Sequence, residues 1–513
     1  MTMELTIRQM IGQKTILGFH GPDLPEDFEA FIREYQVGNV ILFQRNVQSA
    51  DQLYTLCQKI RRVILEATGF PPFIVIDQEG GLVSRIPPDA VNVPSAMALG
   101  ATGNPENAFE AAKITARQLR GLGPNFTMAP VLDVNSNADN PVIGVRSYGD
   151  DPRLVAVFGE AAVRGYEDSG VLCCGKHFPG HGDTSVDSHV GLPCVDKTVE
   201  ELEKMELIPF RRAIEAGIPA IMSTHILFPK IEPDKVPGTM SRKIITGLLK
   251  ERLGFQGLVF TDCLEMNAIQ KFYGTAKGMV EAFRAGVDLA EISSTFSLEC
   301  DAVRYANEVA EQGGLDMDEM RASVKKILAF KEKLADYPLE RSLCNQPKDR
   351  EASRKMARQA LCMYDGTPFA VTEKTFFCGC ADYRTTEAAN LIACVEPFAE
   401  YMTKHFGGGG MTTGKNPQDE EVHKIVNEAS RWDNIVLATC NAHLYTGQLE
   451  LAKALAATGK PLMIVTTRNP YDLPKLPACA CKIAAFDYTK DCFDALIDVF
   501  QGAPLTGTMP VSL

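Results

Sequence analysis

The segment from Lys176 to His189 contains an unusual density of side chains that can transfer protons. It reads Lys-His-Phe-Pro-Gly-His-Gly-Asp-Thr-Ser-Val-Asp-Ser-His and holds three of the eight histidines of the chain. Because Pro179, Gly180 and Gly182 interrupt regular secondary structure, the segment is predicted to be a loop that follows an apolar strand. Loops of this composition on a rigid scaffold are typical places for binding and acid–base chemistry.

Asp187 and His189 form the first candidate pair within this loop. The carboxylate lies two residues from the imidazole, close enough to fix the tautomer of the histidine and to favour its protonated form. We therefore expect His189 to act as a general acid that is assisted by Asp187. The alternative is a hydrogen-bonded loop histidine without a chemical role.

Asp262 is the second candidate, since it follows the apolar run Leu-Val-Phe-Thr at 258–261. A carboxylate that emerges from a buried strand could attack an electrophilic carbon or anchor a ligand. A nucleophilic carboxylate opposite a separate proton donor is the arrangement for double displacement at a sugar anomeric carbon. The alternative is that Asp262 caps a helix that begins near Leu264.

Short apolar runs that alternate with amphipathic segments predict the elements that position these residues. Before residue 300 the apolar runs lie at about 15–19, 39–43, 73–77, 127–132, 171–175, 220–224, 257–262 and 287–291. Eight alternations with continuously apolar strands predict a (β/α)8 TIM-like barrel, with a doubly wound sheet as the alternative. In such a barrel the chemistry lies at the carboxyl ends of the strands.

Polar residues do follow five of the predicted strands at that end. They are Asp77, Asp133, Lys176 with His177, His225 and Asp262. Because the carboxyl ends of barrel strands converge, we expect these side chains to share one rim.

The C-terminal third of the chain predicts a second domain. Residues 1–342 are assigned to the barrel, residues 343–355 to a polar linker that contains a proline, and residues 356–513 to a smaller α/β sandwich. The glycine run at 407–410 lacks the Lys-Ser or Lys-Thr of a phosphate cradle and is interpreted as a loop. No cofactor and no metal are expected.

Composition restricts the partners of the protein. The chain has 513 residues, 45% of them hydrophobic and 23% charged, which is typical of a globular protein with ample core. With a net charge of -13 and no basic run, nucleic acid and anionic membranes are poor partners. We find neither a signal-peptide pattern nor an apolar stretch that could span a bilayer, so a cytoplasmic location is expected. The 15 scattered cysteines fit buried, reduced thiols.

Several of these segments together resemble glycoside hydrolase family 3, and within it the β-N-acetylglucosaminidases of bacterial cell-wall (peptidoglycan) recycling. The segments that match family motifs, in the order of the family, are 77–85, 129–134, 143–147, 176–189 and 261–266. The final Gly-Thr-Met-Pro-Val-Ser-Leu resembles the closing strand of longer members that carry an α/β sandwich. The resemblance thus implies the same two-domain order as the apolar runs.

The resemblance also implies roles for individual residues. Asp262 would be the nucleophile and His189 the acid/base, assisted by Asp187. The residues implied to hold the terminal sugar are Asp77, Arg85, Arg146, Lys176 and His177. Other branches of the family take the acid from a glutamate of the second domain, and the intact Asp-Ser-His run argues against that branch here. Cys263 departs from the acidic or small residue of many relatives, which removes a neighbouring negative charge.

We therefore expect a retaining exo-β-N-acetylglucosaminidase. It would hydrolyse terminal non-reducing β-N-acetylglucosamine from cell-wall-derived or related glycosides through a covalent glycosyl-aspartate, with a small carbohydrate as its partner. A phosphorylase is the first alternative, because a histidine acid repels an anionic acceptor less than a carboxylate would.

Two further alternatives belong to other classes. A metallohydrolase would use His177, His181, Asp183, Asp187 and His189 as ligands, although the neighbouring Lys176 would repel a cation. A non-catalytic sugar-binding protein would need only the fold and the pocket.

Overall fold

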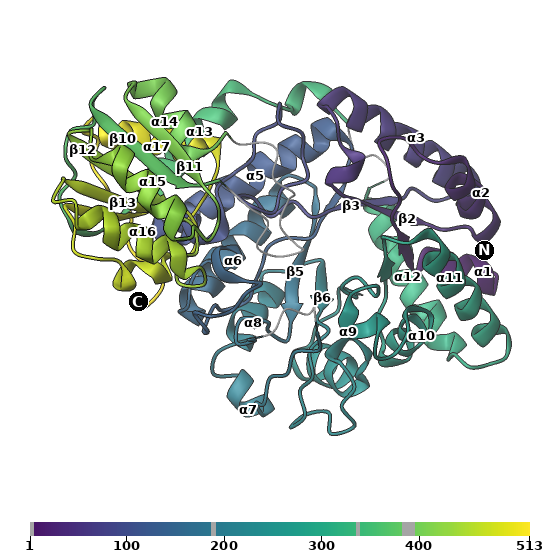
Figure 1. The fold of residues 1–513 in the computed structure, drawn as a ribbon. Coiled ribbons are helices and arrows are strands. Elements are labelled where there is room, and N and C mark those ends of the chain that lie inside the picture. The colour runs from purple at the N-terminus through teal and green to yellow at the C-terminus, as the bar shows by residue number, and fades with distance from the viewer. Residues whose placement is uncertain (1–4, 186–190, 335–338, 382–395) are drawn as a thin grey trace.

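The computed structural model of the protein describes residues 5–185, 191–334, 339–381 and 396–513. Within these ranges the chain forms two sheets, each covered by helices (Figure 1). The first sheet belongs to the N-terminal part of the chain and the second to the C-terminal part, in the predicted order.

In the described part of the chain, eight parallel strands form the first sheet. They are β1 (Thr15–Leu17), β2 (Asn39–Leu42), β3 (Phe73–Ile76), β4 (Phe126–Thr127), β5 (Leu172–Phe178), β6 (Ala220–Ser223), β7 (Leu258–Phe260) and β8 (Ala290–Ile292). Their spatial order, β7-β6-β5-β4-β3-β2-β1-β8, follows the chain. A bridge between Phe260 and Leu289 brings the two edges together. The predicted barrel is confirmed, and the doubly wound alternative is wrong because the strand order never reverses.

The strands of the barrel are buried because both of their faces are covered, and most of their side chains are apolar. Every residue of β1, β2, β3, β6, β7 and β8 is buried. Helices pack on the outer face, and side chains such as Phe126 and Phe260, whose rings lie 5.0 Å apart, fill the inside. This two-sided burial explains the uninterrupted apolar runs of the sequence.

Helices surround the barrel. They are α1 (Ile7–Gln13), α2 (Glu26–Tyr35), α3 (Ala50–Thr68), α4 (Ala96–Ala101), α5 (Pro105–Leu122), α6 (Pro152–Asp168), α7 (Val199–Leu202), α8 (Leu207–Glu215), the π-helical η4 (Lys243–Arg252), α9 (Asn267–Gln270), α10 (Thr275–Ala285), α11 (Phe296–Glu311) and α12 (Met317–Lys333), with short 3-10 turns η1 (Gln44–Asn46), η2 (Gly144–Arg146) and η3 (Gly238–Met240). Side chains cap several of them. Ser49 accepts a hydrogen bond from the amide of Gln52 at the start of α3, and Thr198 forms a capping box with Glu201 at the start of α7.

Helix α12 lies against the amino ends of the first strands. The buried ammonium of Lys331 donates to Gln13 Oε1 at 2.7 Å and to the carbonyl of Gly38 at 2.9 Å. Gln13 lies two residues before the start of β1, and Gly38 directly precedes β2. The opposite end of the barrel, where the strands finish, carries the polar residues described below.

The second sheet has six strands among the described residues. They are β9 (Cys362–Gly366), β10 (Thr375–Cys380), β11 (Gly409–Thr413), β12 (Asn434–Thr439), β13 (Leu462–Thr466) and β14 (Cys481–Ala484), in the order β11-β10-β12-β13-β14-β9. Only β9 pairs antiparallel. The surrounding helices are α13 (Pro347–Ala360), α14 (Phe398–Phe406), α15 (Asp419–Ala429), α16 (Thr446–Ala456), the 3-10 turn η6 (Pro470–Lys475) and α17 (Lys490–Phe500).

Alternating side chains of this sheet enter two separate cores. Phe376 packs in the core on the side of α15 and α16, whereas Phe377 packs in the core on the side of α14 and α17. Helices therefore cover both faces, and the predicted α/β sandwich is confirmed.

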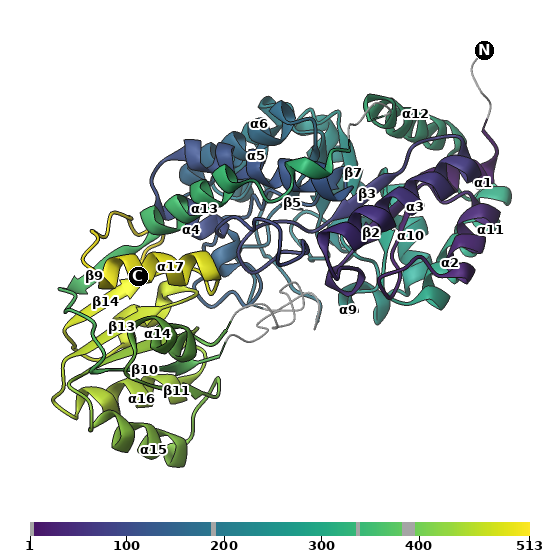
Figure 2. The same cartoon turned by 90° about the horizontal axis from the view of Figure 1, so that it is seen from above.

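The two domains touch, and α13 lies beside α4 of the barrel (Figure 2). Asp487 Oδ2 accepts from the amide of Ser95 at 2.9 Å, and Asn135 Nδ2 donates to Tyr471 Oη at 2.5 Å. The segment expected as a linker, residues 343–355, contains the end of the 3-10 turn η5 (Arg341–Leu343) and the first part of α13. The division into 1–342, 343–355 and 356–513 stays a prediction.

The described residues contain neither a helix that could span a membrane nor a disulfide. None of their helices combines the length and the apolar character that crossing a bilayer requires.

Candidate active site

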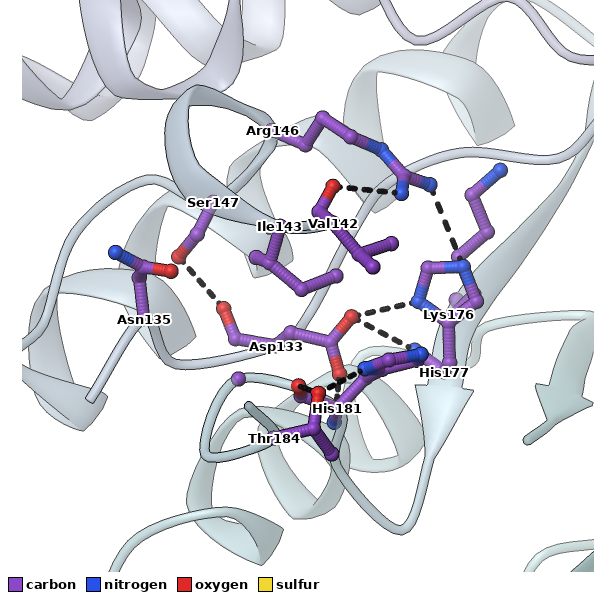
Figure 3. A network of polar contacts seen from close by, with 12 residues as sticks. Asp133, Asn135, Val142, Ile143, Arg146, Ser147, Lys176, His177, His181 and Thr184 are labelled. Atoms are coloured by element: carbon purple, nitrogen blue, oxygen red, sulfur yellow. Dashed lines mark hydrogen bonds and ion pairs between the residues drawn. The ribbon is translucent and has the colours of Figure 1, made fainter. Parts of the chain in front are cut away.

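The carboxyl ends of β3, β4, β5 and β7 bring the predicted residues to one end of the barrel. Asp77 follows β3, Lys176 and His177 lie within β5, and Asp262 follows β7. Arg146 ends η2 in the loop after β4, and its guanidinium reaches His177 (Figure 3). The predicted residues that the structure describes at these strand ends therefore lie at the same end of the barrel, as expected.

Glu79 lies between the two cations of this site. Lys176 Nζ is 2.8 Å from Asp77 Oδ1 and 2.6 Å from Glu79 Oε1. Arg146 donates to both oxygens of Glu79, from Nε at 2.9 Å and from Nη2 at 2.8 Å. Burial opposes ionisation of Glu79, but the two cations more than offset it, so the pKa of Glu79 lies below its ordinary value. The same carboxylates hold the pKa of Lys176 above its ordinary value despite burial.

Asp133 orients the imidazole of His177. Its Oδ2 lies 2.6 Å from His177 Nδ1 and also accepts the backbone N–H of His177 at 3.2 Å. On the other side of the ring, Nε2 lies 3.4 Å from Arg146 Nη2 (Figure 3). Because a guanidinium can only donate, we assign the ring proton of His177 to Nδ1 and the acceptor to Nε2. Burial opposes ionisation of Asp133, but the histidines nearby keep its pKa below the ordinary value.

The first part of the loop after β5 is held by several hydrogen bonds. The amide of His181 donates to Asp133 Oδ1 at 2.7 Å, and His181 Nδ1 lies 2.8 Å from Thr184 Oγ1. Asn140 Nδ2 donates to the carbonyls of His181 and Gly182 at 2.9 and 3.1 Å. Burial, reinforced by His177, lowers the pKa of His181 to about 4. His181 is therefore neutral near pH 7.

The second part of the loop includes Asp187 and His189, and both lie outside the described residues. The chain on its far side is also fixed, because the amide of Val195 donates to the carbonyl of Leu227 at 2.9 Å. The assignment of His189 as acid/base, assisted by Asp187, stays a prediction.

Asp262 begins the turn after β7. Its Oδ1 accepts the backbone N–H of Cys263 at 2.8 Å, and His225 Nε2 lies 3.0 Å from the carbonyl of Cys263. The helix-cap alternative finds no support, because α9 begins at Asn267 with Met266 at its N-cap. The carboxylate of Asp262 is thus held at the end of a barrel strand rather than at a helix terminus.

Glu291 in β8 is a buried carboxyl group next to this turn. Burial raises its pKa well above the ordinary value, and the charges of Asp77 and Asp262 raise it further. Ser293 Oγ lies 3.2 Å from Glu291 Oε1 and 3.2 Å from Cys263 Sγ. We infer that Glu291 is a protonated, neutral acid, and that the side chains of Asp77 and Asp262 both lie near enough to act on it.

Arg85 is also buried, at 5% exposure. Its backbone N–H donates to Gln78 Oε1 at 2.9 Å, and Gln78 Oε1 also accepts from Ser84 Oγ at 3.1 Å. Gln78 is fully buried, so this contact fixes the loop that follows β3 and carries Arg85.

The second domain reaches the edge of this site. A cavity of about 110 Å³ lies between the barrel loop around Arg146 and loops of the sandwich that include Asn441, Tyr445 and Arg468. Among the described residues, no group of three or more His, Cys, Asp or Glu side chains is arranged to hold a metal ion. Asp187 and His189 of the metallohydrolase alternative lie outside the described residues.

Three buried acids of the site have no role assigned from the sequence. Glu79 lies inside a matched motif, Asp133 follows a predicted strand, and Glu291 closes the last apolar run. The sequence signal for these acids is a carboxylate within or directly after an apolar run. Such a carboxylate is buried on folding, so it needs a charged or hydrogen-bonding partner, or its pKa rises.

The chain is similar in sequence and in fold to known proteins. Residues 2–330 match the glycosyl hydrolase family 3 N terminal domain. Beta-hexosaminidase A of Pseudoalteromonas piscicida is 35% identical over 399 residues, which cover 70% of this chain and 67% of the relative. Beta-hexosaminidase of Thiobacillus denitrificans is 38% identical over 309 residues, which cover 59% of this chain and 82% of the relative.

The solved structures that match both domains include one of the same family. It is a glycoside hydrolase family 3 beta-N-acetylglucosaminidase from Paenibacillus sp. str. FPU-7, with a TM-score of 0.93 at 36% identity. The match covers 99% of each chain, so the order of barrel and sandwich is common to both proteins.

Proposed function

Because this chain belongs to glycosyl hydrolase family 3 and is a glycoside hydrolase, we propose that it is a retaining exo-β-N-acetylglucosaminidase. In this proposal it removes terminal non-reducing β-N-acetylglucosamine from cell-wall-derived glycosides such as muropeptides, in the cytoplasm. The names of its relatives, which are beta-hexosaminidases and a beta-N-acetylglucosaminidase, support the sugar.

The observation that carries the proposal is the position of Asp262. Its carboxylate stands at the end of β7, and the pKa of Glu291 responds to it together with Asp77. Asp77 in turn lies 2.8 Å from Lys176. A carboxylate nucleophile next to a charged group of hydroxyl-binding side chains is what displacement at a terminal sugar requires.

We assign sugar binding to Asp77, Arg85, Arg146, Lys176 and His177. Lys176 and Arg146 are fixed donors because Glu79 and Asp77 hold them in place. His177 offers Nε2 toward Arg146 while Asp133 holds Nδ1. Such preorganised groups bind hydroxyls without reorganisation during the reaction.

The proposed reaction has two displacements. First, Asp262 Oδ attacks the anomeric carbon while His189, as imidazolium, protonates the departing glycosidic oxygen, which gives a covalent glycosyl-aspartate and the free alcohol. Then neutral His189 takes a proton from water, the resulting hydroxide attacks the same carbon, and the carboxylate of Asp262 leaves. Asp187 stabilises the imidazolium, and the configuration of the sugar is retained.

A panel of nitrophenyl glycosides with and without the 2-acetamido group tests substrate and reaction together. We expect turnover of the β-N-acetylglucosaminide in phosphate-free buffer, with free β-N-acetylglucosamine as the first product by NMR. Asp262→Asn should lower kcat at least 10³-fold while the thermal unfolding temperature stays unchanged. Turnover that needs phosphate and yields a sugar 1-phosphate would replace the hydrolase with a phosphorylase, and undiminished turnover by Asp262→Asn would exclude Asp262 as nucleophile.

A further inference from the structure

A second hollow lies at the end of the barrel opposite to Asp262. It is a cavity of about 630 Å³ at the amino ends of β1, β7 and β8, and its walls come from η4, α10 and α12. Lys14 directly precedes β1, and Asp288 directly precedes the bridge residue that leads into β8. The volume falls within the range of small-molecule sites, about 300–1,000 Å³.

The lining of this cavity is cationic although the protein as a whole is acidic. Its basic residues are Lys14, Arg242, Lys250, Arg284 and Lys326, and its acidic residues are Asp288, Asp316 and Glu319. Five basic side chains against three acidic ones leave a formal excess of two positive charges, whereas the whole chain carries -13. Positive charge gathered in a concave surface attracts anions.

Three lysines of the lining share one buried carboxylate. Lys326 Nζ lies 2.6 Å from Asp288 Oδ2, and the charge of Asp288 also acts on Lys14 and Lys250. Asp288 already accepts hydrogen bonds from Ser323 Oγ at 2.7 Å and from the amide of Val259 at 2.9 Å. One carboxylate therefore compensates three ammonium groups.

The ammonium groups otherwise contact neutral oxygens. Lys14 donates to the carbonyl of Val287 at 2.9 Å and to Ser323 Oγ, and Lys250 donates to the carbonyl of Gly286. Of the two other carboxylates of the lining, Glu319 binds Arg242 through two hydrogen bonds, and Asp316 caps α12 by accepting from the amides of Asp318 and Glu319. Negative charge near the lysines is thus scarce among the described residues.

The electrostatics of Lys14 agree with this shortage. Burial, together with the charges of Lys250 and Lys326, lowers the pKa of Lys14 to about 7, because Asp288 and Glu319 compensate only in part. Burial also lowers the pKa of Lys250. A bound anion would restore the missing negative charge.

We propose that this cavity binds a phosphate group, either free phosphate or the phosphate of a small phosphorylated metabolite. Lys14, Lys250 and Lys326 supply the ammonium groups that recognise it as point charges. The rings of Phe255 and Phe283 line the same cavity and provide an apolar wall for the remainder of a metabolite. The ligand would link α12 and η4 to the strand ends at which the barrel closes.

Calorimetric titration with inorganic phosphate, at constant ionic strength against chloride, tests the site. We expect saturable binding to the wild type and to Asp262→Asn, and a loss of affinity of at least tenfold in Lys250→Met. Lys277→Met, an exposed residue of α10 outside the cavity lining, should bind as the wild type does. Saturating phosphate should raise the unfolding temperature of the wild type by about 2 °C.

The outcomes separate this site from the catalytic one. Binding that disappears in Asp262→Asn but persists in Lys250→Met, or no binding to the wild type, would overturn the proposal. Phosphate should also protect Lys250 and Lys326 of the wild type from acetylation, a readout that does not depend on the folding of a variant, and unchanged labelling would overturn it as well. A second titration with phenyl phosphate identifies the source, because tighter binding than phosphate indicates a phosphorylated metabolite and weaker binding indicates free phosphate.

Discussion

Glu79 binds the guanidinium of Arg146 through two hydrogen bonds, of 2.8 and 2.9 Å, in a part of the barrel where both side chains are almost fully buried. The same carboxylate lies 2.6 Å from Lys176, so one anion holds two cations. Because those cations are the proposed donors to the sugar, Glu79 determines where their N–H groups point. Glu79 is therefore a positioning residue in a site whose sugar contacts are made by its neighbours.

Replacement of Glu79 with glutamine should reduce both stability and activity. The amide cannot neutralise Arg146 and Lys176, and removal of one partner of a buried ion pair costs about 3–5 kcal/mol. We expect the free energy of unfolding to fall by about that amount and kcat/KM to fall at least 100-fold. Denaturant titration and nitrophenyl-glycoside kinetics measure the two effects. The exposed Glu34→Gln should change unfolding by less than about 0.5 kcal/mol, and an active, stable Glu79→Gln would remove the positioning role.

Asp133→Asn should reduce activity through the orientation of His177. The carboxylate accepts from Nδ1 of that ring at 2.6 Å and from two backbone amides, whereas an amide can turn its NH2 group toward the ring and favour the other tautomer. Loss of one buried, charge-assisted hydrogen bond costs about 2 kcal/mol, which corresponds to a roughly 30-fold decrease in kcat/KM. If His177 holds substrate, the loss should appear in KM as well as in kcat, and kinetics identical to the wild type would contradict the assignment.

Glu291 should become destabilising as the pH rises. Its pKa is raised in the folded protein by burial and by the charges of Asp77 and Asp262, so the folded state retains a proton that the unfolded state releases above the ordinary carboxyl pKa. Stability from this group is therefore complete below about pH 4.3 and is lost as the pH rises toward the folded pKa, by at most about 1.4 kcal/mol per pH unit.

The matched variant for this prediction is Glu291→Gln, which keeps the shape of the protonated acid. Relative to the wild type, its unfolding temperature should increase steadily between pH 4.5 and pH 8, with kcat/KM within about threefold at neutral pH. A difference between the two proteins that does not change with pH would show that Glu291 is ionised in the folded state.

Much of this site could be predicted from the strand ends. The apolar runs that lead to Asp77, Lys176 and Asp262 are buried strands of one barrel, and their carboxyl ends converge for geometric reasons. The partner of Arg146 could not be predicted, because Asp77 and Glu79 are two residues apart and only the folded loop decides which of them meets the guanidinium.

The contact between the domains could not be predicted from the sequence pattern either. Asn135 and Tyr471 lie 336 residues apart and meet through one hydrogen bond, which no local periodicity encodes. The apolar runs predict each domain separately, since burial acts within each core. How the cores dock depends on surface shape, which the pattern of apolar residues does not contain.

Gly182→Ala should displace the loop that leads to His189 and so reduce activity. A Cβ atom at this position would lie 1.6 Å from the carbonyl oxygen of Val134, so the loop after β5 or the segment after β4 must move. Overpacking of this kind costs about 1–3 kcal/mol, and the displaced loop is the one predicted to carry the acid/base. We therefore expect kcat to fall at least tenfold, with a smaller relative change in KM.

Gly414→Ala in the second domain, where the nearest atom is a side-chain oxygen at 3.7 Å, should leave both constants unchanged. If Gly182→Ala retains full kcat, the position of this loop does not govern catalysis, and the acid/base must come from another part of the chain.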